Sequence, residues 1–151
     1  MTKKMIVGLI ALLALAGASF AEYASFQDAM KGGADLLFKQ KAYADAQVVF
    51  ETAKTLSSKT KDLAKADVKI GVCLIKQKKV EEGIALIKSV LAADHSDFVN
   101  FDACVSLGDV YAFRLKDNEM ALKYFNQALT YSKVGDKQKA GVQTKIDKFS
   151  N

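Results

Sequence analysis

Proline and tryptophan are both absent from this sequence of 151 residues. Alanine, leucine and lysine are abundant instead, and these residue types favour helix over sheet by intrinsic propensity. Half of the residues are hydrophobic, which is enough to bury a core and argues against a disordered chain. The length suits one domain. The composition therefore predicts a single all-α domain.

The residue types that most often build active sites are scarce. The single histidine, His95, falls among turn-forming residues, and the two cysteines lack a CxxC spacing. Three aspartates, Asp35, Asp102 and Asp109, could approach one another. Their spacing alone indicates no acid–base chemistry, because no nucleophile or base accompanies them. We therefore predict no enzymatic activity, no catalytic residues, no metal site and no cofactor.

The basic residues give no sign of a nucleic-acid partner. All of them except Arg114 are lysines, and they are scattered among acidic residues along the whole chain. Proteins that bind nucleic acids concentrate charge on one face and favour arginine for phosphate contacts. We therefore expect no nucleic acid to be bound.

The two cysteines, Cys73 and Cys104, allow two interpretations. They can be small buried thiols that fill space between helices. Alternatively they can form a disulfide, which would stabilise the fold by roughly 3–4 kcal/mol through the loop that it closes. The sequence leaves both possibilities open.

The N-terminal segment has the three parts of an export signal. Lys3 and Lys4 precede an uncharged apolar run, and small residues follow it. We predict a signal peptide over residues 1–21, cleaved after Ala21 or, alternatively, after Ala18. The protein is then expected in the periplasm or outside the cell of a bacterium. It would contact the membrane only through an uncleaved signal, since the apolar run is shorter than a typical bilayer span.

Shifted copies of one helical hairpin fill residues 22–134. Equivalent residues are 37 or 38 positions apart, and the extra position falls near the turn Lys116–Asp117 of the third copy. Each copy shows two amphipathic helical patterns joined by a polar turn. The equivalent sets are Ala34, Gly71 and Gly108; Leu37, Leu74 and Tyr111; Ala46, Gly83 and Ala121; and Phe50, Ile87 and Phe125. The small members are expected to let the two helices of a hairpin approach closely.

The copies have recognisable ends. We predict repeats at about 24–57, 60–94 and 97–132, and a final helix over 135–151. Ser25 and Asp28 have the spacing of a capping box at the start of the first helix. The pair Gly32-Gly33 is expected to weaken that helix, so that it bends or frays. The final helix is expected to cap the stack, with an outer side made of Lys137, Lys139, Lys145 and Lys148.

These copies resemble the tetratricopeptide repeat. The third copy carries the resemblance best, through Leu107-Gly108-Asp109-Val110-Tyr111 in its first helix and Ala121, Tyr124-Phe125 and Ala128-Leu129 in its second. The missing prolines and a period longer than 34 residues depart from the family pattern. The resemblance implies a right-handed superhelical stack of about three helix-turn-helix repeats with a C-terminal capping helix. It also implies a concave groove, lined by the first helix of each repeat.

The resemblance assigns inward positions to all three first helices. The candidate partner-binding residues are Phe38, Lys39, Val68, Val72, Ile75, Lys76, Val105, Asp109 and Phe113, and Asp28, Lys31, Asp35, Lys65, Asp102 and Ala112 are further inward positions. Apolar side chains edged by lysines and aspartates would suit a peptide or a partner helix. The alternative is that the terminal helix or neighbouring residues cover several of these side chains.

The resemblance favours a non-catalytic scaffold that binds a protein or peptide in the bacterial envelope. The alternative is a structural module that self-associates end to end. The specialised repeats that grip a chaperone's C-terminal carboxylates are an unlikely match. Lys31 fits their clamp, but Asp35, Lys69, Asp102 and Ser106 occupy its other positions, and the aspartates would repel a carboxylate.

Overall fold

The computed structural model describes residues 23–150, and the predicted signal peptide with both of its cleavage sites lies outside them. The described chain contains helices and no strand, so the predicted all-α fold is confirmed. No helix in this part of the chain is long and apolar enough to cross a membrane. The elements are α2 (Phe26–Ala34), η2 (Asp35–Gln40), α3 (Tyr43–Thr55), α4 (Thr60–Lys76), α5 (Val80–Ala92), α6 (Asp97–Val110), η3 (Tyr111–Leu115), α7 (Asn118–Leu129) and α8 (Asp136–Phe149), where η marks a π-helical turn.

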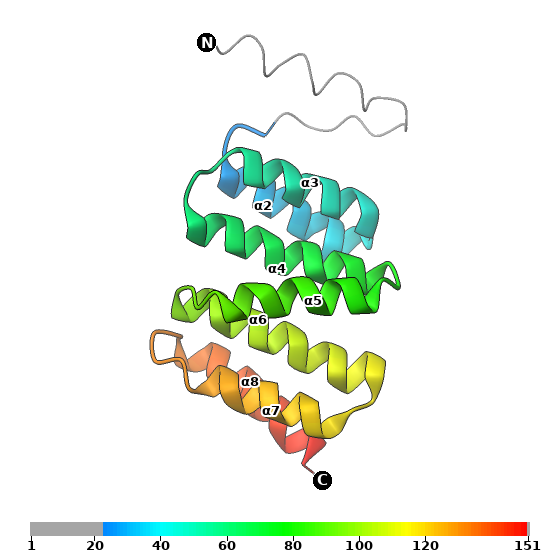
Figure 1. Ribbon diagram of the computed structural model, residues 1–151, viewed down its shortest axis with the longest axis vertical. Helices are drawn as coiled ribbons and strands as arrows, with labels where there is room; N and C mark the ends of the chain where they lie inside the picture. The colour runs from blue at the N-terminus through cyan, green and yellow to red at the C-terminus, as the bar shows by residue number, and fades with distance from the viewer. Residues whose placement is uncertain (1–22, 151) are drawn as a thin grey trace.

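The helices form three antiparallel pairs and a single last helix, which follow one another along the long axis of the molecule (Figure 1). Within the pairs, α2 packs on α3, α4 on α5 and α6 on α7. Between them, α3 contacts α4, α5 contacts α6, and α7 contacts α8. Because α4 also contacts α6 directly, the first helices of the second and third pairs lie side by side. The structure is therefore the predicted helical repeat stack with a C-terminal helix at its end.

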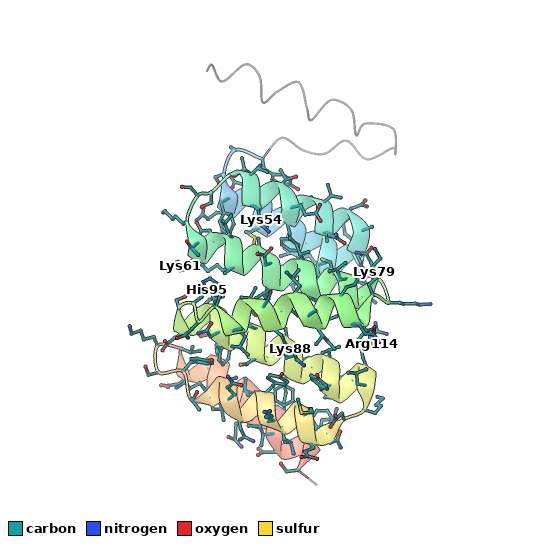
Figure 2. All side chains as sticks on the ribbon, in the orientation of Figure 1. Lys54, Lys61, Lys79, Lys88, His95 and Arg114 are labelled. Carbon is teal, nitrogen blue, oxygen red and sulfur yellow. The ribbon has the colours of Figure 1, made fainter. Side chains whose placement is uncertain are left out.

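The turns of the stack lie on two opposite edges. Lys61 and His95 mark the edge where one pair is joined to the next, whereas Lys79 and Arg114 mark the edge where the two helices of a pair are joined (Figure 2).

Asn100 stabilises the turn that precedes α6 by hydrogen bonds. This side chain is 1% exposed, accepts the N–H of His95 at 3.1 Å and donates to Asp94 Oδ1 and the carbonyl of His95. His95 is therefore a turn residue, and its backbone holds that turn.

In each helix pair, a glycine of the first helix contacts a large side chain of the second helix. A Cβ atom on Gly33 would lie 2.6 Å from the ring of Phe50, and one on Gly71 would lie 2.5 Å from Ile87. Gly108 meets the ring of Phe125 in the same way. The first contact glycine is therefore Gly33, and the assignment of this role to Ala34 was wrong by one position.

The shifted register has a physical cause in the π-helical turns. The contact glycine precedes its large partner by 17 positions in the first and third pairs and by 16 in the second. A π turn accommodates one extra residue without breaking the helix. The turns η2 and η3 occur only in the two longer pairs of the described chain. The extra residue of the third copy was expected near Lys116–Asp117, but η3 absorbs it, and η2 absorbs another one in the first copy.

The start of the first helix follows its sequence signals. The backbone N–H of Asp28 donates to Ser25 Oγ at 3.2 Å, and the Ser25 hydroxyl donates to the Asp28 carboxylate at 2.6 Å, so the predicted cap is confirmed. The expected weakness at Gly32-Gly33 is not seen as a break, because α2 runs through both glycines into η2. Gly33 lies under Phe50, and the ring of Tyr23 lies on Gly32. Glycine has a low helix propensity, but at both positions an aromatic ring packs closely against the glycine.

Both cysteines are free and fully buried, so the possible disulfide is not formed. Cys73 packs with Leu37 and Ile70 in one apolar cluster, whereas Cys104 belongs to the cluster around Leu107. Burial raises the pKa of Cys73 to about 12 and that of Cys104 to about 11. The two thiols are therefore core residues that stay protonated at neutral pH.

We expect neither thiol to react with a thiol-specific reagent in the folded protein at pH 8. Reaction needs an accessible thiolate, and burial denies both access and ionisation. Ellman's reagent should detect two free thiols per chain after denaturation in guanidinium without a reductant, and almost none before it. Rapid labelling of the native protein would contradict the burial of the two cysteines. No labelling after denaturation would contradict their being free thiols.

Asp97 ties the start of α6 to the chain that leads into α8. Its carboxylate accepts the backbone N–H of Lys133 at 2.8 Å and the Ser132 hydroxyl at 3.3 Å. These hydrogen bonds, that of the Lys133 backbone foremost, lower the pKa of Asp97. Because the folded pKa is lower than the unfolded one, this contribution to stability is present above the usual carboxyl pKa of about 3.9 and is lost as the pH falls through the folded value.

The variant Asp97→Asn should therefore remove an acid-dependent part of the stability. Urea unfolding at about pH 6 should show the variant to be less stable than the parent, and the difference should shrink below about pH 4, where the parent carboxylate is being protonated. Asp136→Asn, at an exposed acidic position with no such bonds to Lys133, is the control. An Asp97→Asn difference that is constant with pH would show that the charge contributes nothing.

Candidate functional site

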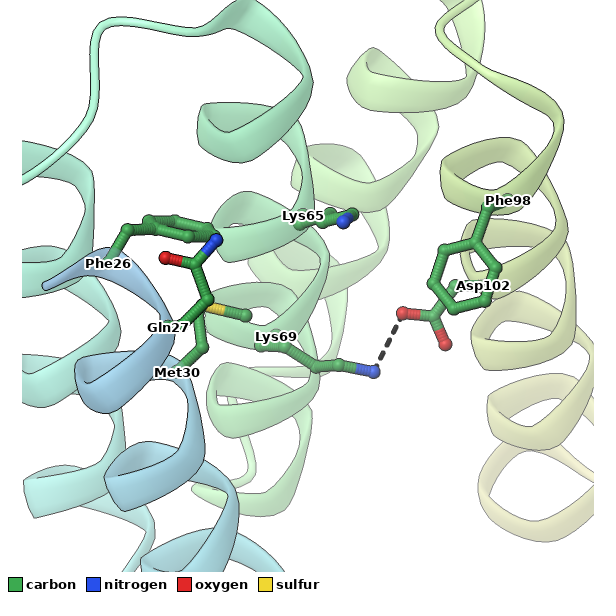
Figure 3. Close-up of a pocket in the computed structure, with 7 residues that line it drawn as sticks. All are labelled: Phe26, Gln27, Met30, Lys65, Lys69, Phe98 and Asp102. Atoms are coloured by element: carbon green, nitrogen blue, oxygen red, sulfur yellow. Dashed lines mark hydrogen bonds and ion pairs between the residues drawn. The ribbon is translucent and has the colours of Figure 1, made fainter.

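A pocket of about 320 Å³ opens between the first helices of the three pairs. Figure 3 shows α2 on one side of it, α6 on the opposite side, and two lysines of α4 that extend from the helix between them. The lining residues are Phe26, Gln27 and Met30 from α2, Lys65 and Lys69 from α4, and Phe98 and Asp102 from α6. The pocket thus lies on the surface where the resemblance placed the groove, toward the N-terminal ends of these helices.

The two sides of the pocket present apolar surface. Phe26 is 6% exposed and packs in the core cluster with Ala29, so its ring is a fixed part of the wall. Met30 is half-buried beside it, and its flexible thioether side chain can adapt to different shapes. Phe98, on the opposite side, leaves 45% of its surface exposed. An aromatic ring left this exposed on a concave surface is suited to contact with another molecule.

The polar groups of the pocket come from α4 and α6. Lys69 Nζ donates to Asp102 Oδ2 at 2.7 Å, an ion pair that links these helices across the pocket floor. Lys65 lies one helical turn before Lys69, and its Nζ is 5.6 Å from the centroid of the Phe98 ring. The ammonium of Lys65 therefore stands at the pocket with an aromatic face on one side, and Asp102 is already paired.

The candidate residues of the middle repeat divide into buried and exposed groups. Val68 is 0% exposed and Ile75 is 5% exposed, so both are core residues and were wrongly expected to form an accessible floor. Ile75 packs against Gly83 within its own helix pair. Val72 is half-buried against the core, and Lys76 is exposed. The accessible face of α4 is accordingly lined by lysines more than by apolar residues.

The C-terminal half of the predicted groove is occupied by α8. Lys145 Nζ on this helix pairs with Asp109 Oδ1 at 2.5 Å, and Phe149 meets the Phe113 ring edge to face at 5.3 Å. Lys148 lies over the Phe113 ring as well. Lys145 was expected on the outer side of the capping helix, and the structure places it inside the stack. The terminal helix therefore contacts Asp109 and Phe113, although Phe113 keeps 46% of its surface exposed.

None of the nine candidate partner-binding residues lines the pocket. Phe38 is 61% exposed at the end of η2, and Lys39 beside it pairs with Asp35 at 2.9 Å. Val105 is half-buried and packs against the core of the third pair. Of the further inward positions, Lys65 and Asp102 lie at the pocket, whereas Ala112 is buried and Asp28 is hydrogen-bonded to Ser25, the N-cap residue of α2.

Sequence reasoning missed the α2 wall and Phe98. The one-residue error at Ala34 shifted the α2 positions from Gln27 and Met30 to Asp28 and Lys31, which turned an apolar wall into a charged one. The spacing of 17 positions between Gly33 and Phe50, equal to that of the third copy, was the available signal. Phe98 lies at the first turn of α6, where the pattern of inward positions had not yet begun.

Among residues 23–150 no three side chains of His, Cys, Asp or Glu are grouped so that they could hold a metal ion. The pocket itself contains a lysine–aspartate ion pair, a second lysine and apolar side chains. Such a set can hold a ligand by apolar contact and charge, and it supplies no activated nucleophile.

Comparison with known proteins gives one match. Residues 101–134 match the family model described as the tetratricopeptide repeat, and they span most of α6, all of η3 and α7, and most of the last connection. This is the copy that carries the resemblance best in the sequence. No curated protein and no solved structure matches the chain.

Proposed function

Because residues 101–134 match the tetratricopeptide repeat family model, we propose that this chain is a non-catalytic scaffold that binds a protein or peptide partner through the pocket between α2, α4 and α6. The single observation that carries this proposal is the pocket itself, with the half-exposed Phe98 ring facing a wall built from Phe26 and Met30. Repeats of this family generally mediate protein–protein interactions. The helices on both sides are rigid elements, which suits a preformed binding surface.

The proposal includes a place of action in the bacterial cell envelope or outside the cell. Its support is the sequence of the first 21 residues, with a charged start, an apolar run and small residues before Ala21. The partner would then be another exported or envelope protein. Analysis of the mature N-terminus of the protein secreted from its host tests this part independently of binding.

Site-specific crosslinking tests the pocket in the intact protein. A photoreactive phenylalanine analogue at position 98 should give a crosslinked product with a second polypeptide in host envelopes, because the ring at this position would touch the partner. The same analogue at Ala85, an exposed position on α5, is the control and should give none. Mass spectrometry then identifies the partner, which is purified for binding measurements.

Two results would overturn the proposal. The first is the absence of any product specific to position 98, and the second is equal crosslinking from positions 98 and 85. A product that consists of two copies of this chain would favour the self-associating module instead. The residues that α2 exposes, such as Gln27, Asp28 and Lys31, are polar, so no observation on this helix favours that alternative.

A further inference from the structure

The charges on the pocket-facing side of α4 are not balanced. Lys61, Lys65 and Lys69 are four positions apart in sequence, and residues with this spacing lie on one face of a helix. Lys69 has an acidic partner, Asp102. Neither Lys61 nor Lys65 pairs with a carboxylate of residues 23–150. The central helix thus carries a row of three ammonium groups, two of which lack a counter-charge.

The two nearest carboxylates of α6 are already paired with lysines. On α6, Asp102 is bound to Lys69 and Asp109 to Lys145 of α8. On α2, Asp35 pairs with Lys39 in η2, whereas Asp28 accepts a hydrogen bond from the neutral Ser25 hydroxyl at the helix start and keeps its negative charge. Among the residues that line the pocket, the charged ones are Lys65, Lys69 and Asp102, and Lys69 pairs with Asp102. The lining therefore carries one unpaired positive charge, at Lys65, directly beside its apolar walls.

From this arrangement we propose that the partner segment carries an aspartate or glutamate next to an aromatic or large aliphatic residue. The apolar side chain enters between Phe26, Met30 and Phe98, and the carboxylate binds Lys65, with Lys61 reinforcing the field. This inference rests on the proposed scaffold function and specifies the class of its partner. Charge-assisted hydrogen bonds are stronger than neutral ones, so Lys65 contributes selectivity for acidic segments.

The geometry favours an acidic peptide over a nucleic acid. A phosphate backbone needs a continuous basic track, and the lysine row is interrupted by the Lys69–Asp102 pair. The pocket walls are apolar side chains that contact a single side chain more readily than a charged backbone. Lys65 also lies 5.6 Å from the Phe98 ring centroid, so one ligand residue pair can touch both groups.

Selection from a library of random dodecapeptides, displayed and captured on the full mature chain, tests the proposal. The parent protein should enrich peptides in which an acidic residue neighbours an aromatic or large aliphatic residue. For a synthetic peptide from that set, Lys65→Glu should weaken binding about tenfold or more. The same substitution in the selection should reverse the preference from acidic to basic residues. Lys79→Glu, an exposed lysine in the turn before α5, is the matched control and should leave the affinity within about twofold.

The outcomes separate this inference from the proposed function. If Phe98→Ser abolishes peptide binding while the acidic preference is absent or survives Lys65→Glu, the partner class is wrong and the scaffold function stands. If no peptide is enriched, or if Phe98→Ser changes nothing, both are overturned. A competition experiment adds single-stranded RNA at the same concentration of negative charges as the selected peptide. If the RNA displaces the peptide, the inference is overturned, because the site would then bind any polyanion. Circular dichroism of each variant verifies that it is folded.

Discussion

Replacing Phe125 by alanine is expected to lower the free energy of unfolding by about 3–5 kcal/mol. Phe125 is 0% exposed, its ring lies on Gly108, and it stacks with Phe149 of α8 at a centroid distance of 6.4 Å. The substitution therefore leaves a cavity between three helices, α6, α7 and α8. Because domains of this size are stable by only about 5–15 kcal/mol, the loss is a large part of the total.

Urea unfolding followed by circular dichroism measures this effect. The matched control is Phe38→Ala, which removes the same side chain from a position that is 61% exposed, and its effect should stay within about 0.5 kcal/mol. If both phenylalanines gave similar small losses, the third helix pair would not be packed as described.

The second large effect is expected at the contact between the two helices of the middle pair. A Cβ atom on Gly83 would lie 2.5 Å from the carbonyl oxygen of Gly71 and 2.6 Å from Cγ1 of Ile75. The intrinsic preference of a helix for alanine over glycine is worth about 1 kcal/mol. Overpacking against a backbone atom costs about 1–3 kcal/mol, and a backbone can relax less than a side chain. Gly83→Ala should therefore be destabilising by up to about 2 kcal/mol net.

The same substitution on α8 should have the opposite sign. Gly141 is an exposed position within this helix, and a Cβ atom there would meet nothing within 4 Å. Gly141→Ala should therefore stabilise the protein by up to about 1 kcal/mol, because only helix propensity acts. Thermal unfolding of both variants compares them directly. A stabilising Gly83→Ala would mean that α4 and α5 are farther apart than the structure has them.

The fold was predictable because the repeat is visible in residue types that packing requires. Gly71, Gly108 and the large residues opposite them recur at nearly constant spacing, and helical periodicity supplies the pairs. The register of the first copy was not predicted, since a π-helical turn adds a residue inside a helix without a turn signal. That single residue moved the expected α2 wall from Gln27 and Met30 to charged neighbours.

The sequence indicated the face formed by the first helices, but none of the nine candidate residues lines the pocket on that face. Spacing along one helix indicates which residues share a face, but it does not show which neighbouring helix covers them. Val68 and Ile75 share a helix with the exposed Lys76, yet both are buried. Likewise, Asp109 became unavailable because Lys145 reaches it from a helix 36 positions later in the chain. Such contacts depend on how the helices pack against one another, and residue spacing within a single helix does not predict that packing.

The most direct test of the account compares two phenylalanines of nearly equal exposure. Phe98 at the pocket is 45% exposed, and Phe113 beneath α8 is 46% exposed. Isothermal titration calorimetry with the partner crosslinked at position 98 would measure the affinity of Phe98→Ser and Phe113→Ser. We predict that Phe98→Ser raises the Kd at least about tenfold and that Phe113→Ser changes it less than about twofold. The reverse pattern, or equal affinity in both variants, would contradict the assignment of the pocket between α2, α4 and α6 as the binding site.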